Sequence, residues 1–256
     1  MFRHRAIQRF VNRWCVVGMI GLAMAVLGFT GHPSVAQETQ SDLPPFARHS
    51  MPASLEAWTG TGEGDYFEEV QPVDGIGYLV WPAFPVTVYI EPPAALEGDR
   101  SQVWFNLVRQ AVNEWSAYLP MAQSDSPANA NITIWRDTPS IQTDEAGQPR
   151  ARSAETRYRV YVETIGDRQQ LTHQMTVVVR PGQPDVHLVA AARHELGHAL
   201  GVWGHSPNEM DALYFSQVRH PPGISARDVS TLKRVYEQPT RLGWSVPRSD
   251  ITSSVP

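Results

Sequence analysis

The pentapeptide His-Glu-Leu-Gly-His at positions 194–198 limits the fold of this chain more than any other part of its sequence. His194 and His198 stand four positions apart, which on an α-helix places both side chains on one face, about one turn apart. Two imidazoles in this arrangement can hold one Zn²⁺, with Glu195 beside the open coordination position. The motif therefore predicts a zinc-binding helix with the outline of a hydrolytic centre.

A third metal ligand is expected shortly after this helix. Gly201 can end the helix in a left-handed conformation, so that the chain turns and a later histidine reaches the same metal. We predict that His205 is this ligand. If the loop does not deliver it, the substitutes are Glu209, Asp211 and His220, because each offers a nitrogen or oxygen that Zn²⁺ accepts.

The first 36 residues have the pattern of an export signal. A basic start without acidic residues precedes an uncharged apolar run at 14–30, and Ser34-Val35-Ala36 supplies the small residues at which a signal peptidase cleaves. We expect cleavage after Ala36 and a periplasmic or extracellular location. The alternative is an uncleaved membrane anchor, since an apolar run of about 17 residues is at the lower limit for spanning a bilayer.

Removal of the signal peptide takes away the only cysteine and makes the net charge of the chain more negative. The only cysteine, Cys15, lies in the signal, so the mature protein has no disulfide, no cysteine-ligated zinc and no cysteine nucleophile. Four of the 21 basic residues are also lost, which leaves 17 Lys and Arg against 26 Asp and Glu, a formal charge of −9. Nucleic acids and anionic membranes attract basic surfaces, so neither is expected as a partner. We expect a monomer.

Apolar patterning predicts the elements around the metal-binding helix. A β-branched run bounded by prolines predicts a strand at 86–90, and similar runs predict strands at 131–135, 156–163 and 171–179. Residues 101–119 carry apolar side chains at the 3.6-residue spacing of a helix with one buried face.

Capping signals mark two helices in the C-terminal part. Asp185 follows a Pro-Gly break and is predicted to cap the metal-binding helix, which we expect to span 186–200. Ser225 and Asp228 have the spacing of a capping box before a last helix, which Pro239 closes.

These elements predict one folded domain of the α+β class. Residues 37–75 are rich in Pro, Gly, Ser, Thr and acidic residues, which indicates a linker or a pro-segment. The main domain is expected at 76–245, followed by a C-terminal tail at 246–256. In that domain a mixed sheet of four to five strands packs on the metal-binding helix and two further helices.

The C-terminal third resembles the metzincin metalloproteases, most closely the matrixin branch. The segment 194–201 matches their active-site helix, His205-Ser206 matches the third ligand and the serine after it, and Ala212-Leu213-Tyr214 stands where the methionine turn belongs. Residues 224–236 resemble the closing helix of the family, and the looser resemblance extends over 81–238. It implies a twisted sheet, zinc in a cleft, and a metalloprotease-like catalytic domain at 76–245.

Two departures from the family pattern stand out. The family places its third histidine ten residues after the first, whereas here Gly204 occupies that position and His205 comes one residue later. Glycine tolerates backbone angles that other residues avoid, so Gly201 and Gly204 give the loop room for the extra residue. Leu213 replaces the family's methionine beneath the zinc, with Met210 as the alternative apolar floor.

The motif and the resemblance together imply an exported zinc-dependent metalloendopeptidase. Three neutral imidazoles would hold Zn²⁺, Glu195 would act as general base and then as acid, and a polypeptide would bind in extended form along an edge strand. Asp65 in the possible pro-segment is a candidate to cap the zinc in a latent state. The alternatives are a catalytically inactive binding or scaffold protein with the same fold, and a hydrolase of cell-wall peptides.

Overall fold

The computed structural model describes residues 43–60, 62–94, 98–143, 147 and 149–247. The predicted signal peptide and nearly all of the predicted C-terminal tail lie outside these residues. Within the described part of the chain, no helix is both long and apolar enough to cross a membrane.

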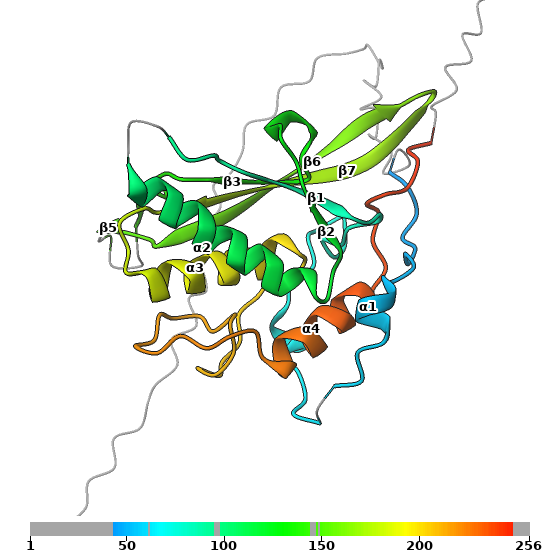
Figure 1. The fold of residues 1–256 in the computed structure, drawn as a ribbon. Helices are drawn as coiled ribbons and strands as arrows, with labels where there is room; N and C mark the ends of the chain where they lie inside the picture. The colour runs from blue at the N-terminus through cyan, green and yellow to red at the C-terminus, as the bar shows by residue number, and fades with distance from the viewer. Residues whose placement is uncertain (1–42, 61, 95–97, 144–146, 148, 248–256) are drawn as a thin grey trace, which may run out of the picture. The chain divides into compact units, whose positions relative to one another are not determined.

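A five-stranded mixed sheet forms one layer of the fold (Figure 1). The strand order is β2-β1-β3-β7-β6; neighbouring strands are parallel except for β6 and β7, which are antiparallel. This confirms the α+β class with five strands, the upper end of the expected number. The strands are β1 (Val86–Ile90), β2 (Met121–Gln123), β3 (Ile132–Trp135), β6 (Ala154–Ile165) and β7 (Arg168–Val179).

The strand β1 has the bounds that its sequence predicts. Val86, Val88 and Ile90 are buried, whereas the alternate residues are only partly covered, as expected for one face packed on the core. Its prolines, at 85 and 92–93, flank it on both sides, which stops the ladder because proline has no N–H to donate.

The β6–β7 hairpin is longer than its sequence predicts. The two strands pair from Ala154 with Val179 to Ile165 with Arg168, and Gly166 has φ of 60°, as a tight two-residue turn requires. Most of β6 beyond Thr156 is exposed or only partly buried, so this part of the strand has no clear apolar alternation. Periodicity therefore could not find the end of the hairpin.

Two helices, α2 (Asp99–Ser116) and α3 (Asp185–Ala199), pack together against the sheet (Figure 1). Trp104 of α2 donates its indole N–H to the carbonyl of Val179 at 3.2 Å, which ties the helix to β7. Trp115 donates to the carbonyl of Arg193 at 2.8 Å and so ties α2 to α3. These contacts fix the position of the helix that carries the histidines.

The capping predictions have different outcomes. The box before α4 (Ala226–Tyr236) is confirmed: the Ser225 side chain accepts from the Asp228 N–H, and the Asp228 side chain accepts from the Ser225 N–H. The predicted cap of α3 is wrong, because Pro184 is the N-cap residue and Asp185 is already helical. Pro184 has a ψ of 141° and stands outside the helix, and Asp185 lies in the first turn, where a negative charge favours the positive end of the helix dipole.

Residues 43–60 and 62–75 belong to the same folded unit. Leu55, Tyr66 and Val70 are buried, and the Tyr66 hydroxyl donates to the Asp228 carboxylate of α4 at 2.5 Å. The segment holds α1 (Ala53–Glu56) and the short 3-10 helix η2 (Phe67–Glu69). The other short elements are η4 (Pro127–Asn129) and a ladder of β4 (Gln142–Thr143) with β5 (Pro149–Arg150).

Candidate metal centre

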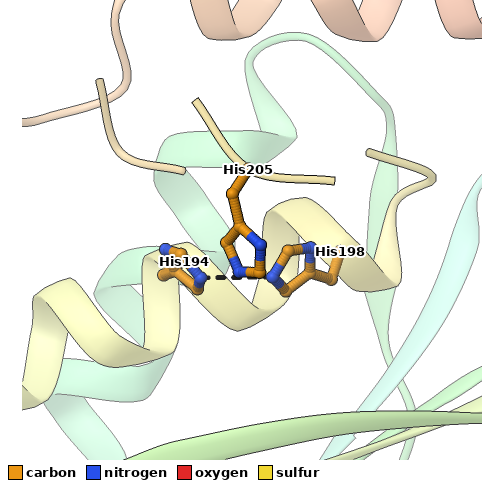
Figure 2. Close-up of side chains that lie close together, drawn as sticks. All are labelled: His194, His198 and His205. Carbon is orange, nitrogen blue, oxygen red and sulfur yellow. Dashed lines mark hydrogen bonds between the residues drawn. The ribbon is translucent and has the colours of Figure 1, made fainter. Parts of the chain in front are cut away.

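The three predicted ligands come together at one point. His194 and His198 lie one turn apart on α3, and His205 reaches over them from the following loop, as Figure 2 shows. One potential ligand atom from each side chain lies within 4.8 Å of the others. Among the described residues, no other group of three or more His, Cys, Asp or Glu side chains gathers in this way.

Two glycines allow the loop to deliver His205 despite its extra residue. Gly201 has φ of 122°, a value that side-chain-bearing residues rarely adopt, and so turns the chain at the end of α3. At Gly204, a Cβ atom would collide with the carbonyl of Glu69, because the end of η2 passes directly against the loop. The N–H of Gln71 donates to the carbonyl of Trp203 at 3.0 Å and holds the two segments together.

Hydrogen bonds to the backbone orient both helix-borne histidines. Nδ1 of His194 lies 2.9 Å from the carbonyl oxygen of Ala212, and Nδ1 of His198 lies 2.8 Å from that of Val202. A carbonyl oxygen can only accept, so each Nδ1 carries a proton, and in the matching tautomer the ring has its lone pair on Nε2. The hydrogen bonds from Nδ1 to the backbone thus select the tautomer that binds a metal through Nε2.

The donor set fits a cation. The Nε2 atoms of His194 and His198 lie only 3.1 Å apart, and in the tautomers that the backbone bonds select neither Nε2 has a proton to donate to the other. Two lone pairs at this distance repel, and a metal ion bound by both nitrogens removes the repulsion. The residues present therefore suit a metal ion.

The protonation states agree with metal binding. Burial, followed by the nearby His194 and His205, lowers the pKa of His198 well below its usual value. Burial and then His194 lower the pKa of His205 to about 4. Both rings are neutral at pH 7, the form in which imidazole binds a metal.

Glu195 lies against the edge strand of the sheet. The Oγ1 atom of Thr156 on β6 donates to Oε2 of Glu195 at 2.7 Å. Burial raises the pKa of Glu195 above its usual value, and the opposing effects of His194 and the Thr156 hydrogen bond reduce this shift. A carboxyl group with a raised pKa is suited to taking up and returning a proton near neutral pH.

Sequence reasoning did not find Thr156. It starts the predicted strand 156–163, and nothing in that pattern indicates a contact with a residue 39 positions away. The register of β6 on β7 and the packing of α3 beneath them decide this pair.

Leu213 forms the floor beneath the histidines. It is completely buried, and a Cβ atom added to Gly197, between the two helix-borne histidines, would clash with its side chain. Met210 is 65% exposed, so the alternative in which it supplies the floor is wrong. The same turn provides the Ala212 carbonyl that orients His194, which couples the floor to the metal ligands.

The substitute ligands lie elsewhere. The buried Asp211 carboxylate accepts hydrogen bonds from the hydroxyls of Ser206 and Ser225 and from the guanidinium of Arg227. Its acceptor capacity is therefore used in holding the turn. Glu209 and His220 are exposed and do not belong to the histidine cluster.

Asp65 does not approach the cluster as a zinc cap would. Its carboxylate accepts from the Phe67 N–H at 2.9 Å and forms an ion pair with Arg234 of α4 at 2.8 Å. The structure thus gives Asp65 a role in fastening the N-terminal segment, which overturns the capping hypothesis.

A separate cavity of about 410 Å³ lies at the N-terminal end of α3. It is lined by His187, Arg219 and Ser153, the residue before β6, among other residues. His187 stands two helical turns before His194, roughly 10.5 Å along the axis. The cavity therefore lies beside the histidine cluster rather than over it.

A scan of protein-family models finds no match for this chain, and a search of the curated proteins finds none either. The geometry consequently carries the classification. A five-stranded mixed sheet, a helix with two histidines and a third histidine from the next loop are consistent with a zincin-like site.

Proposed function

We propose that this protein is an exported zinc-dependent metalloendopeptidase of the metzincin type, most similar to the matrixins. The observation that carries the proposal is the convergence of three imidazoles beside a buried carboxyl group. A purely structural metal site closes its coordination sphere with four protein ligands, whereas three ligands leave the open position that hydrolysis needs.

The chemistry follows from this arrangement. Zinc bound at such a site acts as a Lewis acid and lowers the pKa of water toward about 7. Glu195 accepts the proton of the attacking water on Oε1, the oxygen that does not accept from Thr156, and then delivers it to the departing amine. Thr156 positions the carboxylate by binding its other oxygen.

The substrate binds along β6. This strand pairs only with β7 in the described sheet, so its outer edge has free backbone groups, and Thr156 brings this edge beside Glu195. An extended peptide can add to such an edge through main-chain hydrogen bonds. The topology favours β6 over β7, because β7 lies between β3 and β6.

Export and an aqueous environment are part of the proposal. The basic and apolar N-terminus and the small residues before position 37 support cleavage after Ala36. The acidic balance of the mature chain supports a monomer without nucleic-acid or membrane partners. N-terminal sequencing of the exported protein should begin at Gln37; an intact N-terminus in the membrane fraction would support an anchor instead.

A catalytically inactive scaffold with the same fold is the alternative. The position of the third histidine and the missing methionine would favour it, whereas the approach of His205 to the cluster and the packing of Leu213 against Gly197 favour the enzyme. A cell-wall peptide hydrolase would use the same water chemistry on a different amide, so the choice of substrate in the assay separates it from an endopeptidase.

The test uses the mature protein, residues 37–256, with casein, a quenched peptide library and peptidoglycan stem peptides as substrates. Zinc content is measured for the wild type and for Glu195→Ala. We expect stoichiometric zinc in both proteins, and cleavage of casein and the library by the wild type only. Equal cleavage by both proteins, or cleavage of the stem peptides alone, would overturn the endopeptidase assignment.

A further inference from the structure

The loop that leads to His205 places a tryptophan beside the candidate catalytic centre. The ring of Trp203 lies edge-on to that of His198, with 5.8 Å between centroids, and edge-on to that of Tyr158 on β6, with 5.0 Å between centroids. Trp203 is partly buried and Tyr158 is 38% exposed. The two rings thus form an accessible aromatic corner between the loop and the edge strand.

This corner lies on the path of a chain bound along β6. Side chains alternate along a strand, so Tyr158 projects from the same face as Thr156, which contacts Glu195. The two positions are separated by roughly 6.8 Å along the strand, the repeat of one face. A peptide that adds to the β6 edge therefore brings a side chain over the corner when its scissile bond lies beside Glu195.

The surroundings of the corner are apolar. Val160 and Val162 continue the face of β6 that carries Tyr158, and Val162 is 47% exposed. By alternation, Arg157 and Arg159 belong to the opposite face. A large apolar side chain fits these surfaces, because aromatic rings prefer edge-to-face contacts with one another and bury large apolar areas.

The loop holds the tryptophan in place before any ligand arrives. The N–H of Trp203 donates to the Gly201 carbonyl at 2.9 Å, and its carbonyl accepts from Gln71. Gly204, the next residue in the chain, packs directly against the carbonyl of Glu69. A side chain fixed in this way loses little conformational freedom on binding, which favours recognition.

We propose that Trp203 and Tyr158 form a specificity site that binds an aromatic or large aliphatic side chain of the substrate close to the scissile bond. This inference rests on the proposed peptidase function. The loop that carries His205 would then also supply a substrate contact.

Binding is tested in the Glu195→Gln background, where bound peptide is expected to be cleaved far more slowly than by the wild type. Fluorescently labelled peptides cleaved by the wild type are compared in two forms, with Phe or with Ala at the variable position nearest the cut. We expect Trp203→Ala and Tyr158→Ala each to weaken the Phe peptide about 5- to 20-fold and the Ala peptide less than twofold. Tyr161→Ala, on the same strand but the opposite face, is the matched control and should change neither.

Cleavage-site sequencing with the active protein gives the second readout. The wild type should enrich aromatic and large aliphatic residues at one position near the cut, and Trp203→Ala should flatten that enrichment while Trp203→Phe retains most of it. Zinc content is measured for every variant. If Trp203→Ala loses zinc, Tyr158→Ala decides, because Tyr158 lies outside the metal-binding loop.

The outcomes separate the two claims. If the wild type cleaves peptides and the tyrosine and tryptophan variants keep its preference and its affinities, the specificity site is ruled out while the peptidase function stands. If the wild type cleaves no peptide under any condition, the proposed function fails, and this inference fails with it.

Discussion

At the scale of single residues, the pair of Glu195 and Thr156 decides whether the metal centre is catalytic. A metal held for structural reasons needs no buried carboxyl group beside it, and burying one is costly. Glu195→Gln keeps the shape of the side chain but removes the base. We expect kcat/KM to fall about 10²- to 10⁴-fold with zinc content unchanged, as measured with a quenched peptide. A variant with wild-type kcat/KM would contradict the base assignment.

Thr156 is predicted to act through Glu195 rather than on the substrate. Thr156→Val keeps the branched shape but removes the donor to Oε2, which leaves the carboxylate free to rotate. We expect kcat to fall about tenfold, with KM and zinc content close to those of the wild type. Thr156→Ser restores the hydroxyl and should recover most of the rate. Failure of serine to rescue would show that the methyl group matters instead.

At the scale of elements, the conformation of the loop between α3 and His205 depends on its contact with the end of η2, near Glu69. Gly204→Ala places a methyl group against the Glu69 carbonyl, so the loop must shift and carry His205 with it. We expect zinc affinity to fall about 10- to 100-fold, the range seen when the support of a ligand is disturbed. Gly223→Ala is the control, because its added Cβ has no atom within 4 Å. Chelator competition measures both; equal affinities would show that the contact does not position His205.

Asp228 joins three elements that are distant in sequence. Its buried carboxylate accepts from the Tyr66 hydroxyl, from the Ala212 N–H at 2.8 Å and from the Ser225 N–H at 2.7 Å. Asp228→Ala leaves these donors without their partner, so we expect the free energy of unfolding to drop by about 3–5 kcal/mol in urea denaturation. Ser225→Ala removes one acceptor of the capping box and one hydroxyl donor to Asp211, and should cost less, about 1–2 kcal/mol. Similar losses for both variants would mean that Asp228 acts only as a helix cap.

At the scale of the whole molecule, metal binding should stabilise the fold. The ligands come from α3 and the following loop, and the unfolded chain does not hold them together, so bound metal favours the native state. At a free metal concentration 100-fold above its Kd, the gain is about 2.7 kcal/mol, which corresponds to roughly 5–10 °C in Tm for a chain of this size. Scanning calorimetry with and without chelator measures it. His205→Ala should show a much smaller difference, and an equal one would exclude His205 as a ligand.

Local patterns in the sequence predicted the elements whose formation depends on near neighbours. The strand at 86–90, the capping box at Ser225 and the pairing of His194 with His198 on one helix face all follow from contacts between residues at most four positions apart. The α+β class followed from the same patterns. At the start of α3, where Pro184 rather than Asp185 is the N-cap, the helix begins one residue before the predicted position.

The amino-acid sequence by itself determined the two helix-borne histidines of the candidate metal site, the candidate base and the class of fold, because these depend on residue type and short spacing. Only the tertiary structure decided that His205 reaches the cluster, that Thr156 binds Glu195, and that β6 offers the free edge. Each of these depends on surfaces brought together from distant parts of the chain, as where Glu69 meets Gly204. Such contacts leave no periodic trace in sequence, since the register of the sheet and the packing of α3 create them.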